Sequence, residues 1–146
     1  NDDNIVLDLL TPYRLRGGEG AVERRIVGGL LGQWAVWTRK AVELLEERHR
    51  LVEQGGGVPA DLLRLAVELT DANAAIFDAA NGFAGCIPGI HEVLRRQGLL
   101  DGIGCLDPNE TLSPGQAEEI DRVCRAYPGL NDDAFVRENL DRWLSD

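Results

Sequence analysis

Two arginines and a glycine-rich stretch near the start of the chain have the chemistry of an anion site. Arg14 and Arg16 could each hold a carboxylate through the paired hydrogen bonds that a guanidinium group donates. The stretch GGEG at residues 17–20 could instead bind a phosphate through its backbone N–H groups. The acid Glu19 within this stretch weakens that interpretation, because a carboxylate repels an anion. The sequence therefore leaves open a small carboxylate- or phosphate-binding protein.

The only lysine of the chain, Lys40, is the side chain to consider for covalent chemistry. A lysine amine attacks a ketone when a dry pocket or a neighbouring cation lowers its pKa. Lys40 lies at the start of a predicted helix, next to Arg39 and close to Glu43, where a charged and solvated amine is expected. We predict no catalytic residue within this chain.

The cysteines and histidines show no spacing typical of a metal site. Cys86, Cys105 and Cys124 are an odd set without a C-x-x-C pair, which favours reduced thiols over a disulfide framework or a zinc site. His49 and His91 lie far apart on separate predicted helices. We expect neither a metal ion nor a cofactor.

The overall composition limits the partners of the protein. The chain has 146 residues, 44% of them hydrophobic, and a formal net charge of −10. Such a charge disfavours nucleic acid and anionic membranes, because both require a basic surface. No apolar run is long enough to span a bilayer. No basic stretch precedes an apolar one from residue 1 onward, so we expect a protein without an export signal. We expect a cytoplasmic protein that binds neither nucleic acid nor membrane.

The first forty residues are predicted to fold as strand, helix and strand. The apolar run NIVLDLLTP, residues 4–12, is typical of a buried strand in its length and its closing proline. VERRIVGGLLG, residues 22–32, predicts a short helix, and QWAVWT, residues 33–38, predicts a second strand. The stretch TPYRLRGGEG is predicted to be a loop, because its glycines permit unusual backbone angles.

The rest of the sequence is predicted to be helical. The most regular pattern runs from Leu62 to Ala80, where apolar residues recur every three or four positions. Other helices are predicted over residues 38–54, 86–100, 112–128 and 130–144. Two strands cannot form a stable sheet by themselves, and a strand–helix–strand unit normally belongs to a larger sheet. The chain also lacks methionine and begins at Asn1, so we expect that something preceded it.

Three stretches of this sequence resemble one enzyme family. They are GGLLGQWAVWT at residues 28–38, AANGFAGCIPGIHEVLRRQGLL at 79–100 and LSPGQAEEIDRV at 112–123, with Pro108 in the loop between the last two. Their order resembles the C-terminal part of the dihydrodipicolinate synthase and N-acetylneuraminate lyase family. The resemblance covers about one hundred residues, and none of the matched positions is the family's chemical signature.

The resemblance implies an α/β parent protein with the (β/α)₈ TIM-barrel fold, assembled as a homo-oligomer, usually a homotetramer. This chain would be its mostly helical C-terminal fragment with strands seven and eight. Residues 1–40 would form the last βαβ unit, and residues 41–146 would form helix eight and a helical tail. The small residues before Pro88 would let one helix lie close to its neighbour.

The same resemblance implies a Schiff-base-forming lyase or synthase of the aldolase type that acts on pyruvate or a related 2-oxo acid. The imine-forming lysine of the family lies on a strand that precedes the matched region, so the chain alone would be inactive. Residues just past strands seven and eight would face the substrate, as in other barrels. These candidate substrate-binding residues are Thr11, Tyr13, Arg14, Trp37 and Thr38.

A different class of function also fits the sequence. The chain could be a self-contained helical interaction or oligomerisation module, with the front segments as a small addition. The glycine and proline residues between Gly82 and Pro88 would then be an ordinary connection between two helices of a bundle.

Overall fold

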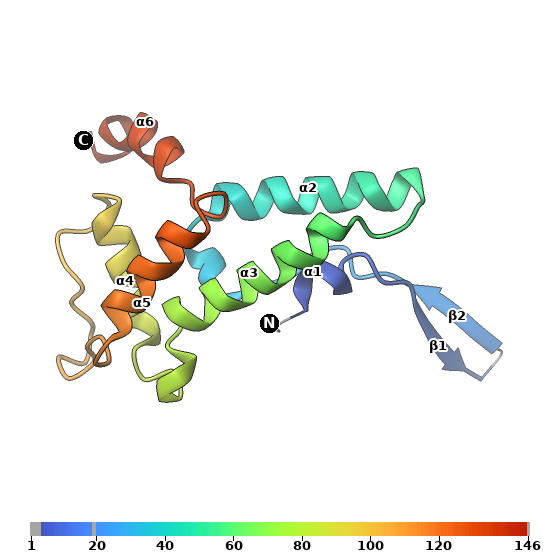
Figure 1. Ribbon diagram of the computed structural model, residues 1–146, viewed down its shortest axis with the longest axis horizontal. Coiled ribbons are helices and arrows are strands. Elements are labelled where there is room, and N and C mark those ends of the chain that lie inside the picture. The colour runs from blue at the N-terminus through green and yellow to red at the C-terminus, as the bar shows by residue number, and fades with distance from the viewer. Residues whose placement is uncertain (1–3, 19, 146) are drawn as a thin grey trace.

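A computed structural model describes residues 4–18 and 20–145 and shows a helical body from which one β-hairpin projects (Figure 1). In chain order the elements are α1 (Ile5–Asp8), β1 (Tyr13–Gly17), β2 (Gly20–Arg24), the 3₁₀ helix η1 (Gly32–Ala35), α2 (Thr38–Gln54), α3 (Ala60–Ile76), the 3₁₀ helix η2 (Ala79–Asn81), α4 (Cys86–Arg96), α5 (Gln116–Ala126) and α6 (Asp133–Leu144).

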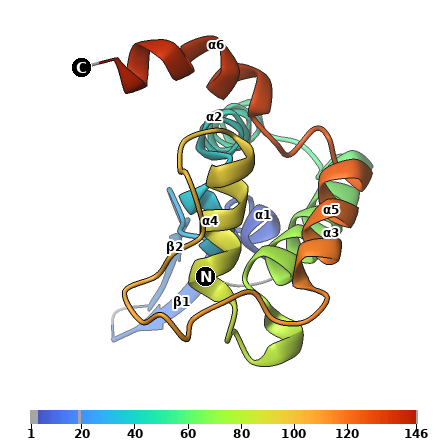
Figure 2. The same ribbon diagram turned by 90° about the vertical axis from the view of Figure 1, so that its left-hand side faces the viewer.

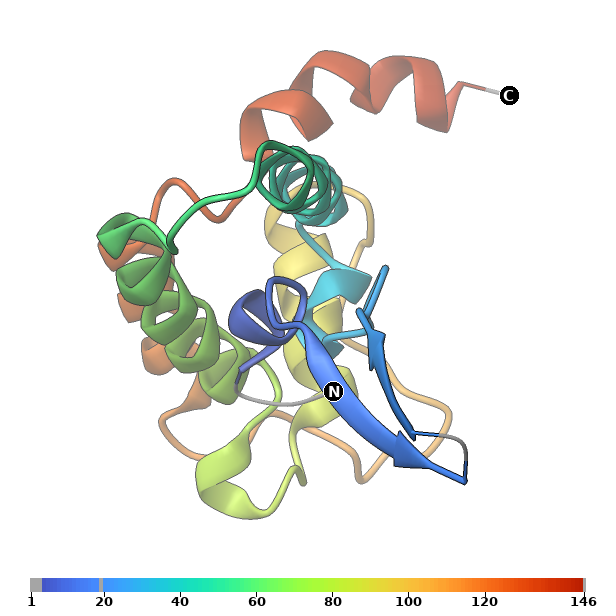
Figure 3. The ribbon, with the colours of Figure 1, turned by 90° about the vertical axis from the view of Figure 1, so that its right-hand side faces the viewer.

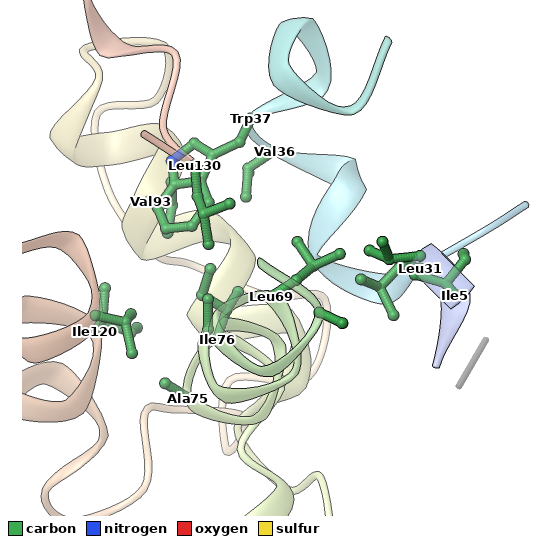
Figure 4. Close-up of a cluster of buried hydrophobic side chains, with 14 of the residues drawn as sticks. Ile5, Leu31, Val36, Trp37, Leu69, Ala75, Ile76, Val93, Ile120 and Leu130 are labelled. Atoms are coloured by element: carbon green, nitrogen blue, oxygen red, sulfur yellow. The ribbon is translucent and has the colours of Figure 1, made fainter. Parts of the chain in front are cut away.

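Helix α3 is the centre of the hydrophobic core and contacts α1, η1, α4 and α5. Its buried side chains recur at helical spacing, which confirms the apolar pattern predicted for this segment. Figure 4 shows Leu69 and Ile76 of α3 among side chains from the surrounding elements, including Ile120 of α5 and Val93 of α4. The helix ends at Ile76, four residues before the predicted end at Ala80.

The chain then turns sharply between α3 and α4. Asp78, Gly82 and Phe83 all have positive φ angles, so this connection breaks the helix with left-handed backbone. Two glycines at the start of α4 allow it to approach α3. A Cβ at Gly89 would overlap with the carbonyl oxygen of Ile76, and one at Gly85 would overlap with the side chain of Gln116. Small residues are therefore needed where α4 meets the backbone of α3 and where its start meets the side chain of Gln116.

The predicted fold class is wrong, because the structure contains neither of the two predicted barrel strands. Ile5, Val6 and Leu9 lie in or next to α1, a single helical turn, and all three are buried. A short apolar run has the same composition in a buried strand and in a buried helical turn, so it could not distinguish the two. In the structure this run packs against α3 as a helical turn.

The other two predictions for the first forty residues are also wrong. Residues 22–32, predicted as a helix, contain the end of β2 and an exposed irregular stretch. Residues 33–38, predicted as a strand, form most of η1 and the start of α2, with Trp37 in left-handed conformation between them. The stretch predicted as a loop contains β1, which pairs antiparallel with β2 so that Tyr13 lies opposite Arg24.

The chain is therefore a mostly helical protein with one antiparallel hairpin in its described residues, and it is not a barrel fragment with strands seven and eight. The helices predicted after residue 38 are present, and α2 has the predicted bounds of Thr38 and Gln54. Figures 2 and 3 show α6 at the outside of the body, beyond α2, with the C-terminus directed away from the other helices.

Candidate functional site

A cavity of about 400 Å³ lies between α2 and α3 and is the strongest candidate for a binding site. Its walls are mainly apolar and come from η1, α2, α3 and the segment after α5. These wall residues are Trp34, Trp37, Ala41, Leu44, Leu65, Leu69, Gly129 and Leu130. Charged residues of α2 and one amide complete the lining, namely Lys40, Glu43, Glu47, Arg50 and Gln33.

The left-handed conformation of Trp37 places the two tryptophans in this cavity. Its φ of 55° turns the chain between η1 and α2, and the backbone N–H groups of Lys40 and Ala41 donate to its carbonyl oxygen at 3.0 and 3.2 Å. The hydroxyl of Thr38 donates to the carbonyl oxygen of Trp34 at 3.0 Å, which closes the turn. A bulky residue rarely adopts a positive φ, so the burial of the Trp37 ring must offset the cost.

Gln33 is a buried residue of the cavity wall. Its backbone N–H donates to Oδ1 of Asn73 on α3 at 3.0 Å, which fixes η1 against that helix. The residue is only 1% exposed, and its side-chain Oε1 has no hydrogen-bond partner among the described residues. A buried oxygen without a donor costs about 1–3 kcal/mol of desolvation free energy.

The acids of the cavity rim are already neutralised by neighbouring cations. Glu43 accepts hydrogen bonds from Arg39 at 2.8 Å and Lys40 at 3.1 Å, and these contacts hold the pKa of Glu43 below its ordinary value. Glu47 forms an ion pair with Arg48 at 2.8 Å. Arg50 forms no ion pair with any residue that the structure describes. It is thus the available positive charge at the rim.

Arg48 itself is an unusual buried cation on α2. Its side chain is 0% exposed, and burial lowers its pKa despite the charge of Glu47. The 2.8 Å separation from Glu47 brings the charges together, but Nε, Nη1 and Nη2 have no aligned hydrogen-bond partner within the described residues. A buried ion pair stabilises a fold only when its remaining donors are also satisfied.

A second polar cluster joins the turn after α3 to the start of α5. The carboxylate of Asp78 accepts hydrogen bonds from Asn81 at 2.7 Å, Ser113 at 2.5 Å and the backbone N–H of Gly85 at 2.8 Å. Burial acts to raise the pKa of Asp78, but these three hydrogen bonds outweigh it and hold the pKa below its ordinary value. Gln116 adds hydrogen bonds to the carbonyl oxygens of Ile76 and Gly85, at 3.2 and 2.9 Å.

Every polar atom of the Asp78 carboxylate is therefore used to hold the turn. This cluster is a structural junction, since all its contacts connect segments of the chain to one another. Within this cluster Ser113 bonds across to Asp78, while Gly115 occupies the N-cap position of α5.

Cys105 and His91 bring a thiol close to an imidazole. Sγ of Cys105 lies 3.8 Å from Nδ1 of His91 and donates to the carbonyl oxygen of Ile103 at 3.5 Å. Burial, together with the nearby Glu110 and Asp107, raises the pKa of the Cys105 thiol. A protonated thiol is a poor nucleophile, so this pair is a weak candidate for catalysis.

The predicted substrate-binding residues lie in two separate places. Of the five, Trp37 alone borders the cavity, and Thr38 follows it at the start of α2. The hydroxyl of Thr11 donates to the carbonyl oxygen of Leu7 at 2.7 Å, and that of Tyr13 donates to Asp8 at 2.5 Å. Arg14 is exposed on the hairpin opposite Glu23. The structure therefore does not bring these residues to one site.

Sequence reasoning did not identify Gln33, Arg50 or Leu65 as site residues. Gln33 lies next to Trp34, and Lys40 and Arg50 lie on α2, so helical spacing along α2 could have suggested part of the rim. No such signal connects them to Leu65 on the following helix.

Within residues 4–18 and 20–145, no helix is long and apolar enough to cross a membrane. Comparisons with protein-family models, curated proteins and solved structures find no match to this chain.

Proposed function

We propose that this chain is an association segment, a helical unit that packs against another polypeptide. The observation that carries the proposal is the exposed hairpin and the stretch that follows it. Every residue of β2 is exposed, and Val27 and Leu30 beyond it are 77% and 84% exposed. A two-stranded hairpin is marginally stable in water, and its unpaired edges are templates for further pairing.

The resemblance noted above supplies the class of partner. We propose that the partner is the catalytic part of a Schiff-base-forming lyase or synthase that acts on pyruvate or a related 2-oxo acid. Support comes from the three matched stretches, which include η1, α4 and the first part of α5. Under this proposal the chain contributes packing and subunit contacts in a homo-oligomer, and the imine-forming lysine lies outside it.

Chemical trapping tests the catalytic part of this proposal. The protein is incubated with pyruvate and sodium borohydride, and its intact mass is measured with the Lys40→Arg variant as control. We expect no adduct, because the ammonium of Lys40 is half exposed and pairs with Glu43 at 3.1 Å. A reduced adduct that disappears in Lys40→Arg would show that the chain forms an imine by itself and would contradict the proposal.

Sedimentation velocity tests the association part. We expect the isolated chain to self-associate with rising concentration, because the exposed apolar residues lack their partner. The double variant Val27→Asp/Leu30→Asp should remain monomeric. Leu106→Asp is the matched control, because Leu106 is also fully exposed but lies on a different loop, and it should behave like the unchanged chain. Equal behaviour of all three proteins would contradict the proposal.

A self-contained oligomerisation module is the second candidate function. The observation in its favour is that Leu69, Ile76, Ile120 and Val123 already form a buried core within the chain. Such a module should form one closed oligomer, because symmetric interfaces are satisfied at a defined size. A single dimer or tetramer in the sedimentation experiment would favour this function, whereas open-ended association would favour the segment of a larger lyase.

A further inference from the structure

We propose that the cavity between α2 and α3 binds a small amphipathic carboxylate. The apolar body of this ligand lies against Trp34 and Trp37, and its carboxylate contacts Arg50. This inference is independent of the proposed association function, because the cavity is lined by η1, α2, α3 and residues 129–130 and does not include the hairpin.

The size and the walls of the cavity suit a small molecule with an aromatic or branched body. About 400 Å³ falls in the range of ligand pockets, which are mostly apolar with a few polar groups that fix orientation. Two tryptophan rings and the leucines of α2 and α3 provide this apolar surface. Aromatic side chains bury a large area and favour the stacked or edge-on packing of a second ring.

The charges at the rim specify the polar group of the ligand. Glu43 is neutralised by Arg39 and Lys40, and Glu47 is paired with Arg48, so neither acid attracts a cationic ligand strongly. Arg50 remains available for an anion. A guanidinium group donates two parallel hydrogen bonds to a carboxylate. The nearby acids and the net charge of −10 favour a single carboxylate over a multiply charged phosphate.

Two related probes test the ligand class by calorimetry and tryptophan fluorescence. 3-Phenyllactate carries the ring and the carboxylate, and we expect it to bind and to change the fluorescence. Phenyllactamide has nearly the same shape without the charge, so it should bind about fivefold to tenfold more weakly. The same affinity for both probes, or no binding of 3-phenyllactate, would overturn the proposal.

Variants of the cavity locate the binding. Leu65→Trp should fill the cavity and abolish binding, while circular dichroism checks that the helices remain. Arg50→Gln is an exposed substitution that should preserve folding and weaken 3-phenyllactate binding about fivefold to tenfold, with no effect on phenyllactamide. Arg137→Gln on α6 is the matched control, since Arg137 is also an exposed arginine. Equal loss in Arg50→Gln and Arg137→Gln, or full binding to folded Leu65→Trp, would refute the assignment of this cavity.

Discussion

Arg48 is the residue whose burial conflicts most with its chemistry. It lies on the inner side of α2, fully buried, with a single acidic neighbour that is half exposed. The free-energy cost of desolvating a guanidinium group in such a position exceeds the favourable free energy of one imperfectly aligned ion pair. Its presence therefore lowers the stability of the isolated chain.

Replacing Arg48 with methionine should raise the free energy of unfolding by about 1–3 kcal/mol, because methionine fills a similar volume without a charge. Urea denaturation followed by circular dichroism measures this change. Arg48→Ala is the control, since it removes the charge but leaves a cavity and should not stabilise the chain as much. A loss of stability in Arg48→Met would show that the buried charge is well compensated.

Gly89 is the residue that sets how closely α4 approaches α3. Gly89→Ala should lower the free energy of unfolding by about 2 kcal/mol or more, because the new methyl group overlaps with the carbonyl oxygen of Ile76. Gly102→Ala is the matched control, since a Cβ there meets nothing within 4 Å. Similar denaturation midpoints for both variants would contradict this account of the small residues.

At the scale of elements, ion pairs and buried carboxylates hold the helices in their arrangement. Glu92 of α4 accepts hydrogen bonds from Arg95 and Arg96, and Arg96 also forms an ion pair with Asp121 of α5 at 2.6 Å. Asp71 of α3 accepts two hydrogen bonds from Arg122 of α5, at 2.7 and 2.8 Å. These directional contacts fix the relative orientation of helices whose core is otherwise stabilised by non-directional apolar burial.

Glu92 should make the stability of the chain depend on pH in the acid range. Hydrogen bonds from Arg95 outweigh burial and, with those from Arg96, lower the pKa of Glu92 from 4.5 to about 2. Because the pKa is lower in the folded state, this stabilisation is present above pH 4.5 and is lost as the pH falls toward 2. Its size is about 1–2 kcal/mol, because solvent around Arg95 screens part of it.

Denaturation midpoints measured between neutral pH and pH 2 test this expectation. Glu92→Gln should reduce the loss of stability at acid pH, whereas Glu46→Gln on the exposed side of α2 should leave the pH profile unchanged. An identical acid profile for Glu92→Gln and the unchanged chain would show that other carboxylates carry the effect.

At the scale of the whole molecule, stability is distributed unevenly. The helices α3, α4 and α5 share a continuous core, whereas β1 and β2 contact mainly each other and are exposed along their length. Elements with few buried contacts open locally at low free-energy cost. The hairpin is therefore the part of the chain that most needs a partner.

Hydrogen exchange should reveal this difference. Backbone amides of β1 and β2 should exchange within the earliest time points, while those of α3 facing the core should exchange only through global unfolding. The Val27→Asp/Leu30→Asp variant provides the control for self-association, which could itself protect the hairpin. Equal protection of the hairpin and α3 in that monomeric variant would contradict an open, unpartnered hairpin.

The sequence by itself determined the helices after residue 38, because their signals are local. The apolar spacing of α3 acts within one or two turns, and Gly55, with its φ of 62°, follows α2 directly. Trp37, predicted to contact substrate in a fold that the structure does not have, borders the cavity.

Only the tertiary structure decided the conformation of the first forty residues and the formation of the cavity. The run Ile5–Leu10 is compatible with a strand or a helical turn until contact with α3 selects one of them. The hydrogen bond between Gln33 and Asn73 joins residues forty positions apart, and Leu130 reaches the same cavity from beyond α5. Such long-range contacts have no counterpart in local spacing, so the cavity emerges only when the elements pack together.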